Sequence, residues 1–376
     1  MYSELKNKII PLVPTRVWRT YLGGKELERW QGASDPEDGE LPEEWIASVV
    51  EARNPGREEL LEGLSKIKIL GFEGLTLKDL IESAPIDFLG KPHFDKFGTN
   101  LGVLAKLIDS LSRLTIQVHP DKIFAKNILK SDYGKTECWY ILGGRKVGGE
   151  KPYVLLGFKP GITKEHWRTL FEEQNIQAML DCLNKIYVKP GEIYFIDGGV
   201  PHAIGSGCFL VEIQEPTDYT MRVERVTPEG NLIPDFLCHQ GVGFDNLYNC
   251  FHYEGLTMEE TLKRWKIQPK KVYEKNGAEK WEIVGKDTTT LFSMDRLLIN
   301  KKYEEKSCET FYSVTVIAGE GKISFCNESL QIRQGDFLFI PALLGTINFE
   351  AVGEISLELI RCYPPTVSNR NREGCI

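Results

Sequence analysis

Short apolar runs separated by glycine and proline turns dominate this chain of 376 residues, 35 of which are glycine. The runs concentrate in residues 8–72, 111–226 and 270–362, in segments such as "YVLLGFKPG" and "DFLFIPA". Runs of about four to eight apolar or alternating residues between such turns are typical of strands in sandwiches and barrels. The length allows two or three domains. We therefore predict a mainly β fold.

Helical patterns interrupt the β-rich regions. Thr163 is a candidate N-cap, and Thr257 stands three residues before Glu260, which is the spacing of a capping box. Residues 100–111, "NLGVLAKLIDSL", carry apolar side chains at helical spacing. The patterns predict helical insertions at about 74–112, 162–186 and 234–266.

A faint internal repeat relates two distant segments, residues 188–205 and 332–347. Each has a turn glycine followed by an acidic residue, an apolar strand and a second turn. Two such units predict two related β-barrels, one in residues 1–266 with the helical insertions and one in residues 267–376. The first copy ends in His202, whereas the second has leucines there and no histidine, so we expect metal ligands only in the first.

The charge and the cysteines exclude several classes of partner and site. The net charge is -8, and no lysine or arginine run marks a nucleic-acid or membrane surface. No segment approaches 18 uninterrupted apolar residues, and the start lacks the apolar core of a signal peptide. Nine scattered cysteines without a C-x-x-C pair fit reduced thiols. We expect a cytoplasmic protein without a nucleic-acid or membrane partner, and any metal must be held by nitrogen and oxygen.

The segment "TIQVHPD" is a strand with an unusually polar face. Because alternate side chains of a strand share a face, Thr115, Gln117 and His119 should point the same way. Glu137 lies within another apolar strand, where an unpaired carboxylate is costly to bury, and His202 follows a proline at a strand end. These nitrogen and oxygen donors suit zinc or another divalent ion. Residue types alone also allow hydrogen-bonded core histidines without any metal.

Basic residues accompany these candidate ligands. Lys135 precedes Glu137 by two residues and should share its face, and Lys106 stands in an apolar run. Arg222 and Arg225 flank a glutamate near the end of the same region. Each cation has an ordinary interpretation, as a snorkelling side chain or as half of a surface ion pair. Several cations beside a metal would suit an anionic substrate such as a sugar phosphate.

Five segments together resemble the type I mannose-6-phosphate isomerases, especially the short bacterial form. They are "LPEEWIAS", "LTIQVHPD", "GKTECWYIL", "KPGEIYFIDGGVPHAIGSG" and "LVEIQEPTDYTMRVER", and the resemblance covers roughly residues 10–270. The combination of Q-x-H-P with a following K-x-E is far more specific than either piece. Members of the family have the cupin fold, so the resemblance implies two cupin-type β-barrels of the jelly-roll kind, the second without metal.

The resemblance also implies a site and a reaction. It implies one zinc ion per chain, bound by residues from the strands described above, and interconversion of mannose 6-phosphate and fructose 6-phosphate through a cis-enediol(ate). The residues that match family positions are the metal ligands Gln117, His119, Glu137 and His202, the substrate-pocket residues Thr115, Lys106 and Lys135, and the catalytic arginine Arg222. Lys135 is also a candidate proton-transfer base. "DYTMRVERV" departs from the family's tyrosine-rich pattern, which leaves Arg225 as an alternative to Arg222.

Two other functions fit a metal-binding cupin. One is a different metal-dependent enzyme, such as a dioxygenase, which would contain redox-active iron and consume oxygen. The other is a sugar-binding cupin without catalysis, which would bind its ligand and show no turnover.

For the oligomeric state, we expect a monomer or a homodimer.

Overall fold

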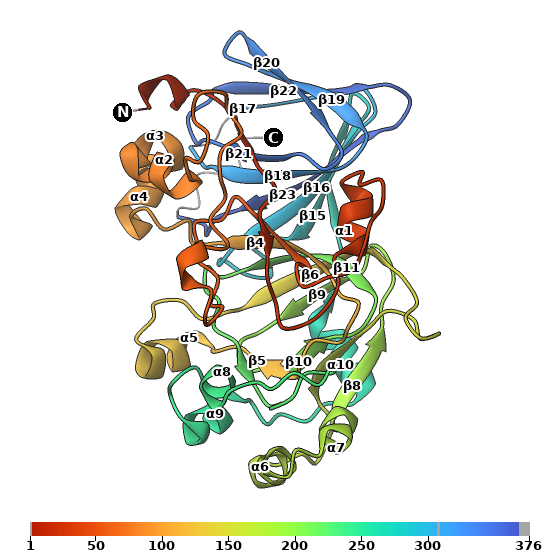
Figure 1. Ribbon diagram of the computed structural model, residues 1–376. Coiled ribbons are helices and arrows are strands. Elements are labelled where there is room, and N and C mark those ends of the chain that lie inside the picture. The colour runs from red at the N-terminus through yellow and green to blue at the C-terminus, as the bar shows by residue number, and fades with distance from the viewer. Residues whose placement is uncertain (1, 307–308, 368–376) are drawn as a thin grey trace.

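Four β-sheets stacked in layers form the body of the protein, as the computed structural model shows for residues 2–306 and 309–367. The order of the layers, from the bottom of Figure 1 upward, is a five-stranded sheet, two seven-stranded sheets and a four-stranded sheet. We call the five- and seven-stranded pair at the bottom the first β-sandwich and the pair at the top the second β-sandwich.

The first β-sandwich contains strands from the N-terminal two thirds of the chain. Its five-stranded sheet has the order β12 (Met221–Arg222), β5 (Gln117–Val118), β10 (His202–Ile204), β7 (Tyr153–Phe158) and β8 (Leu183–Tyr187). Its seven-stranded sheet has the order β13 (Lys266–Ile267), β9 (Ile193–Ile196), β6 (Glu137–Gly144), β11 (Cys208–Gln214), β4 (Leu104–Asp109), β3 (Glu43–Ile46) and β2 (Arg16–Val17).

The second β-sandwich repeats this topology. Its seven-stranded sheet has the order β1 (Ile10–Leu12), β21 (Phe337–Ile340), β18 (Tyr312–Ala318), β23 (Leu357–Tyr363), β16 (Ser293–Ile299), β15 (Ala278–Val284) and β14 (Lys270–Lys275). Its four-stranded sheet has the order β17 (Lys302–Lys306), β22 (Thr346–Val352), β19 (Glu320–Phe325) and β20 (Glu328–Arg333). The mainly β, cupin-type prediction is confirmed, with facing open sheets in place of closed barrels.

The two seven-stranded sheets pack back to back. Side chains that alternate along β4 divide between two cores: Leu107 joins the core between the sandwiches, whereas Ile108 joins the interior of the first β-sandwich. The core between the sandwiches also contains Phe339 and Ile360 from the second sheet. The N-terminal strand β1 pairs with β21 of the second β-sandwich and so crosses the predicted division of the chain at residue 266.

Helices surround the two β-sandwiches, and those within residues 77–97 lie beside the second one. They are α1 (Lys25–Trp30), α2 (Leu77–Ser83), α3 (Pro85–Leu89), α4 (Lys91–Phe97), α5 (Lys122–Phe124), α6 (Lys164–Glu172), α7 (Ile176–Asp181), α8 (Asp235–His239), α9 (Phe244–Cys250) and α10 (Met258–Trp265). Short 3-10 turns at Ser3–Leu5 and Glu58–Leu60 and a π-helical turn at Ala125–Leu129 complete the helical elements. Thr163 caps α6, and Thr257 forms the predicted capping box with Glu260.

The helix predicted over residues 100–111 is wrong. Residues 104–109 form β4, which pairs with β3 on one side and β11 on the other, and all six residues are buried. Apolar residues fill both faces of a central strand, so the pattern loses its period of two and matches helical spacing by chance. Similarly, the end of the predicted insertion 162–186 is strand β8.

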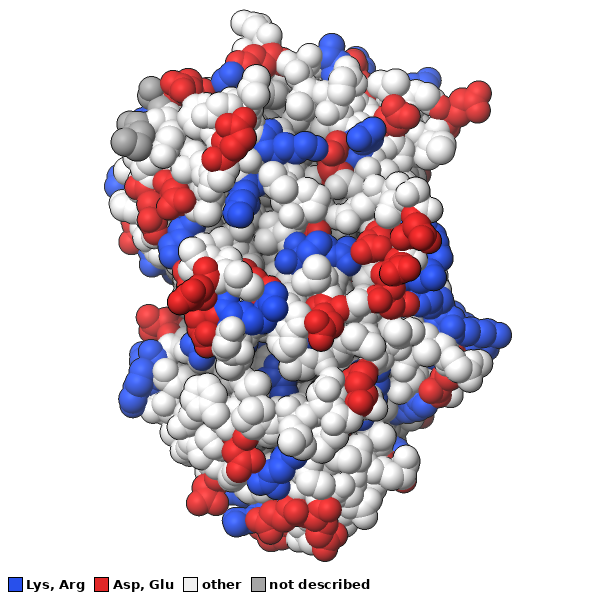
Figure 2. Space-filling view, in the orientation of Figure 1, with Lys and Arg blue, Asp and Glu red and all other residues white. Residues whose placement is uncertain are grey.

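The surface carries mixed charge. Figure 2 shows acidic and basic side chains interspersed over the face drawn, without a large area of one sign. No helix in the described part of the chain is long and apolar enough to cross a membrane.

Candidate metal centre and substrate pocket

Three buried side chains meet inside the first β-sandwich. His119 follows β5, Glu137 begins β6 and His202 begins β10, so both sheets contribute. Nε2 of His119 lies 3.2 Å from one carboxylate oxygen of Glu137, and Nε2 of His202 lies 3.4 Å from the other. The three ligand atoms lie within 4.8 Å of one another, which is the arrangement expected around a single divalent ion.

Backbone carbonyl groups orient both imidazole rings. Nδ1 of His119 donates to the carbonyl of Tyr219, and Nδ1 of His202 donates to the carbonyl of Val200, each over 2.9 Å. This leaves the Nε2 lone pairs facing the carboxylate, as in sites where the second ring nitrogen fixes the ligating tautomer. Burial lowers the pKa of both histidines, and the charge of Lys135 adds to this for His119. Both rings are therefore neutral, as metal binding requires.

The carboxylate of Glu137 lacks a hydrogen-bond donor. Both of its oxygens are buried without a hydrogen-bond partner among the described residues, although Nζ of Lys135 approaches one of them to 3.7 Å. A carboxylate buried without hydrogen-bond donors costs roughly several kcal/mol of folding free energy unless a cation compensates its charge. Two neutral imidazoles facing this carboxylate fit a divalent metal ion well.

Gln117 borders the triad. It pairs with His202 in the strand register, and its Nε2 lies 3.2 Å from Nε2 of that histidine. The oxygen and nitrogen of a glutamine amide exchange places on a flip of the side chain, which would turn the oxygen toward the metal centre. Ile116 and Val118 pack in the core outside the five-stranded sheet, so the predicted alternation of this segment is confirmed.

A pocket inside the first β-sandwich lies beside the triad. Thr115, Gln117, Lys106, Lys135 and Arg222 all line it, which brings the predicted substrate residues together. Nζ of Lys135 lies 3.0 Å from Nε2 of His119, so this lysine connects the pocket lining to the triad. Burial lowers the pKa of Lys135, and the charge of Lys106 lowers it further.

Lys106 is held by two carboxylates. Its Nζ lies 3.1 Å from Glu212 and 3.8 Å from Glu43. Burial alone would lower the pKa of Lys106, but these two carboxylates outweigh burial and raise it. Lys106 and Lys135 thus lie in one pocket with opposite electrostatic surroundings.

The two candidate arginines lie in different places. Arg222 lines the pocket and donates to the carbonyls of Thr220 and Leu237 at 3.1 and 3.2 Å, and no ion pair to a carboxylate is formed by it in the described residues. Arg225 lies outside the pocket, where it stacks on Phe171 and pairs with Asp235 at 3.0 Å. This placement favours Arg222 as the arginine that meets a substrate.

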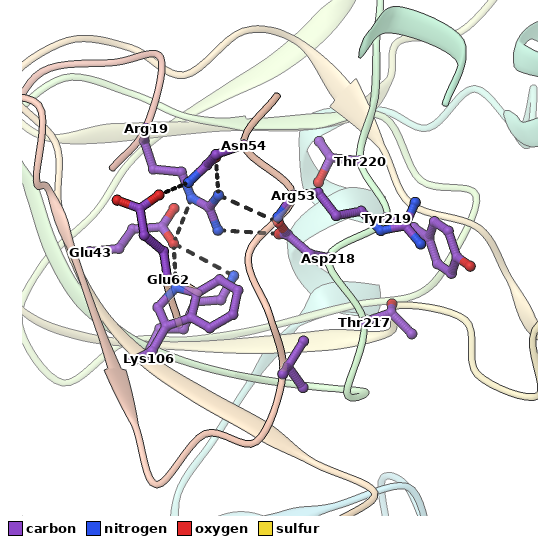
Figure 3. Close-up of polar contacts among 12 residues, drawn as sticks. Arg19, Glu43, Arg53, Asn54, Glu62, Lys106, Thr217, Asp218, Tyr219 and Thr220 are labelled. Carbon is purple, nitrogen blue, oxygen red and sulfur yellow. Dashed lines mark hydrogen bonds and ion pairs between the residues drawn. The ribbon is translucent and has the colours of Figure 1, made fainter. Parts of the chain in front are cut away.

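Sequence reasoning missed four charged residues that line the same pocket: Arg19, Glu43, Glu212 and Asp218. Figure 3 shows the guanidinium of Arg19 between Glu43 and Asp218. Glu43 and Glu212 lie within apolar strands, and a carboxylate buried there needs a charged or hydrogen-bonding partner. Such a position in the sequence could therefore have indicated these two pocket residues. Arg19 and Asp218 are 199 positions apart and carry no local signal.

Comparisons with known proteins agree with this geometry. Residues 22–137 match the family described as phosphomannose isomerase type I, catalytic domain, and residues 285–364 match the mannose-6-phosphate isomerase cupin domain. The mannose-6-phosphate isomerase of Streptococcus mutans is 26% identical over 73% of this chain and 80% of its own length. ManA of Bacillus subtilis is 26% identical over 75% of this chain and 81% of its own length.

Solved structures share the fold. The crystal structure of the Bacillus subtilis mannose 6-phosphate isomerase superposes with a TM-score of 0.71 at 24% identity, covering 94% of this chain and 99% of that one. A mannose 6-phosphate isomerase bound with zinc and yttrium superposes with a TM-score of 0.68 at 16% identity, covering 95% and 100%.

Proposed function

Because the chain belongs to the type I phosphomannose isomerase family, we propose that it interconverts mannose 6-phosphate and fructose 6-phosphate with one bound zinc ion. The observation that carries the proposal is the buried carboxylate of Glu137, which faces two neutral histidines beside a pocket lined by four basic side chains. His119, Glu137 and His202 would hold the metal, with Gln117 as a fourth ligand through its amide oxygen.

The reaction moves a proton between two neighbouring carbons of the open-chain sugar. When bound, the metal polarises the sugar carbonyl and stabilises the negative charge that develops on its oxygen. Lys135 is the candidate base, because burial and the charge of Lys106 lower its pKa toward the range that suits a general base. Its place beside His119 would put its amine next to a substrate held by the metal.

The other pocket residues bind and orient the sugar phosphate. Arg222 offers a guanidinium without a carboxylate partner among the described residues, and its charge persists through the reaction. Lys106 is fixed by Glu212 and Glu43, and Thr115 offers a hydroxyl group on the same wall. Binding energy from the phosphate, remote from the reacting carbons, can then be used for orientation.

The alternatives differ in measurable ways. Two histidines and a carboxylate also bind iron in oxygenases, so a dioxygenase would contain iron and consume oxygen. A sugar-binding cupin would bind the ligand without converting it. The four basic residues of the pocket favour an anionic substrate and a reaction that does not consume molecular oxygen.

A coupled assay of mannose 6-phosphate conversion, with metal analysis of the same sample, tests the proposal. We expect turnover that disappears on chelation and returns with zinc. Oxygen uptake with bound iron, or ligand binding without turnover in the metal-loaded protein, would overturn it. Light scattering would decide between the monomer and the homodimer, and the cytoplasmic location stays a proposal.

A further inference from the structure

The carboxylate of Asp218 lines the pocket and occupies an anion-binding site. Nη2 of Arg19 lies 3.2 Å from one of its oxygens, and the other oxygen accepts from Nη1 of Arg19 at 3.4 Å and from the backbone N–H of Arg53 at 2.8 Å. A guanidinium fork together with a backbone N–H group is an arrangement that also binds phosphate. Figure 3 shows both donors converging on Asp218.

The site is built rather than fortuitous. The Arg19 side chain is 9% exposed, and its position is fixed by Glu43 at 3.0 Å and by the Asn54 amide oxygen at 3.1 Å. Burial alone would raise the pKa of Asp218, but the charges of Arg19, Lys106 and Lys135 outweigh it and lower the pKa. Asp218 is therefore an anion at neutral pH.

The charge of the pocket favours a more strongly charged anion than Asp218. Four basic side chains and three carboxylates line the pocket, and Asp218 is one of the three. With Asp218 withdrawn, the lining would carry two positive charges in excess. A phosphate group carries roughly −1.5 to −2 at neutral pH and would neutralise them.

The Asp218 side chain can leave without disturbing its backbone. Its neighbours are anchored on both sides: Thr217 donates through its hydroxyl to the Gly134 carbonyl at 2.8 Å, and the Tyr219 carbonyl accepts from His119. The Asp218 carboxylate itself bonds to the Arg19 side chain and to the backbone N–H of Arg53, and the Asp218 side chain is 9% exposed. A side-chain rotation would therefore free the anion site and leave the metal ligand in place.

The pocket needs such a change to admit a substrate. It has about 40 Å³ of free volume, room for one or two water molecules at ~30 Å³ each. Ligand sites for small molecules are usually ~300 Å³ or larger. With Asp218 in place, a sugar phosphate cannot be enclosed.

We propose that Asp218 is an internal stand-in for the substrate phosphate, and that the phosphate takes its place on Arg19 and the backbone N–H of Arg53 when substrate binds. This inference rests on the proposed function for the identity of the substrate. Asp218 then competes with the phosphate and lowers the apparent affinity by the fraction of molecules in which it occupies the site.

The test measures the dissociation constant of inorganic phosphate by calorimetry at fixed ionic strength, and its inhibition constant against mannose 6-phosphate. Asp218→Asn should bind phosphate ~10-fold more tightly, because the competing charge is gone. Arg19→Gln should bind it at least ~10-fold more weakly. Arg19→Lys, which keeps the charge and loses the fork, should lie between Arg19→Gln and wild type.

Glu62→Gln is the matched control, since it removes one carboxylate from the same cluster at a position that does not line the pocket. It should leave phosphate affinity unchanged, and metal content should equal that of wild type in every variant. Weaker or unchanged phosphate binding by Asp218→Asn would overturn the inference. Calorimetry needs no turnover, so absence of isomerase activity in wild type would count against the proposed function alone.

Discussion

The two β-sandwiches place opposite charges at the same position of the same sheet. In the first, Lys106 of β4 lies opposite Glu212 of the neighbouring strand β11. In the second, β16 and β23 hold the equivalent places, and Asp295 lies opposite Arg361. Both pairs point into the interior of their sandwich. The polarity of the pair is reversed between the two.

What surrounds each pair decides whether a pocket forms. Arg361 is fully buried, bonds to both oxygens of Asp295 at 2.7 and 2.9 Å, and bonds to Glu305 at 2.6 Å. Tyr303, Tyr312 and Tyr363 surround its guanidinium at 5.6 to 5.7 Å. The second interior therefore satisfies its own charges and packs closed, whereas the first leaves cations facing a pocket.

Apolar and aromatic side chains take the place of the metal ligands on the equivalent strands. Glu137 is the first residue of β6, and the buried Tyr312 is the first residue of the equivalent strand β18. His202 begins β10, whereas the equivalent strand β22 begins with the exposed Thr346 and turns Ile347 and Phe349 into its interior. One fold thus supports a metal centre or a packed core, depending on a few inward-facing side chains.

Replacing His202 should have the largest effect. His202→Ala should lower metal occupancy and reduce isomerase activity by more than ~1,000-fold, since it removes a ligand of the ion that stabilises the oxyanion. The control Thr346→Ala, at the exposed first residue of the equivalent strand β22, should keep both. Full activity of His202→Ala in metal-free form would break the proposed difference between the sandwiches.

Breaking the buried ion pair of the second β-sandwich should cost stability and spare catalysis. Arg361→Met leaves Glu305 without its buried cation and leaves Asp295 with only Lys280 at 3.6 Å, which should lower the free energy of unfolding by ~3–5 kcal/mol. Turnover per folded, metal-loaded molecule should stay within about twofold of wild type at low temperature. Chemical denaturation and an activity assay on the same preparation measure both. A large loss of turnover at full metal occupancy would mean that the second sandwich contributes to catalysis.

Removing the pocket arginine should lower kcat. Arg222→Ala removes a fixed charge near the reacting oxygens, and we expect a ~100-fold lower kcat. Arg225→Ala, which removes an arginine outside the pocket, should retain wild-type kcat and lose modest stability through its contacts with Phe171 and Asp235. If the two phenotypes are reversed, the assignment of this strand is wrong.

The smallest predicted effect is a change in the pH dependence of stability, caused by a glutamate on the sheet face between the two sandwiches. Glu43 and Glu44 are neighbours on β3 and face opposite sides; Glu43 faces the pocket, where Arg19 and Lys106 outweigh burial and lower its pKa. Burial raises the pKa of Glu44 to about 7, despite bonds from Thr15 and Gln31.

A folded-state pKa above the unfolded value favours the protonated carboxyl. The stabilisation is present below the unfolded pKa of ~4.3 and is lost as pH rises through about 7, and the part lost between pH 5 and pH 8 is ~2–3 kcal/mol. Denaturation at pH 5 and pH 8 should show that Glu44→Gln removes this part of the stability loss. An unchanged pH dependence would contradict it.

The sequence predicted what local pattern controls. Alternation placed Thr115, Gln117 and His119 on one face, and a threonine three residues before a glutamate predicted the cap of α10. The prediction from sequence failed where pairing with distant strands determines the secondary structure. Strand β4 is buried on both faces, so its sequence pattern resembles that of a helix. Strand β1 completes a sheet whose other strands lie more than 250 positions away in the sequence.

The site divides in the same way. The polar strand face and the family resemblance indicated the residues of the metal triad, but the ion pairs among Arg19, Glu43 and Asp218 join separate parts of the chain. Nothing near any one of these residues in the sequence indicates its partner. Only the packing of the N-terminal arm against residues 217–220 brings them together.

Titration of the metal-free protein with zinc, followed by activity toward mannose 6-phosphate, tests the central claim most directly. The described residues contain one candidate metal centre, which lies in the first β-sandwich, so activity should rise linearly and level off at one ion per chain. His202→Ala should show no such rise. Full activity before any metal is added, or a plateau at two ions per chain, would contradict the account.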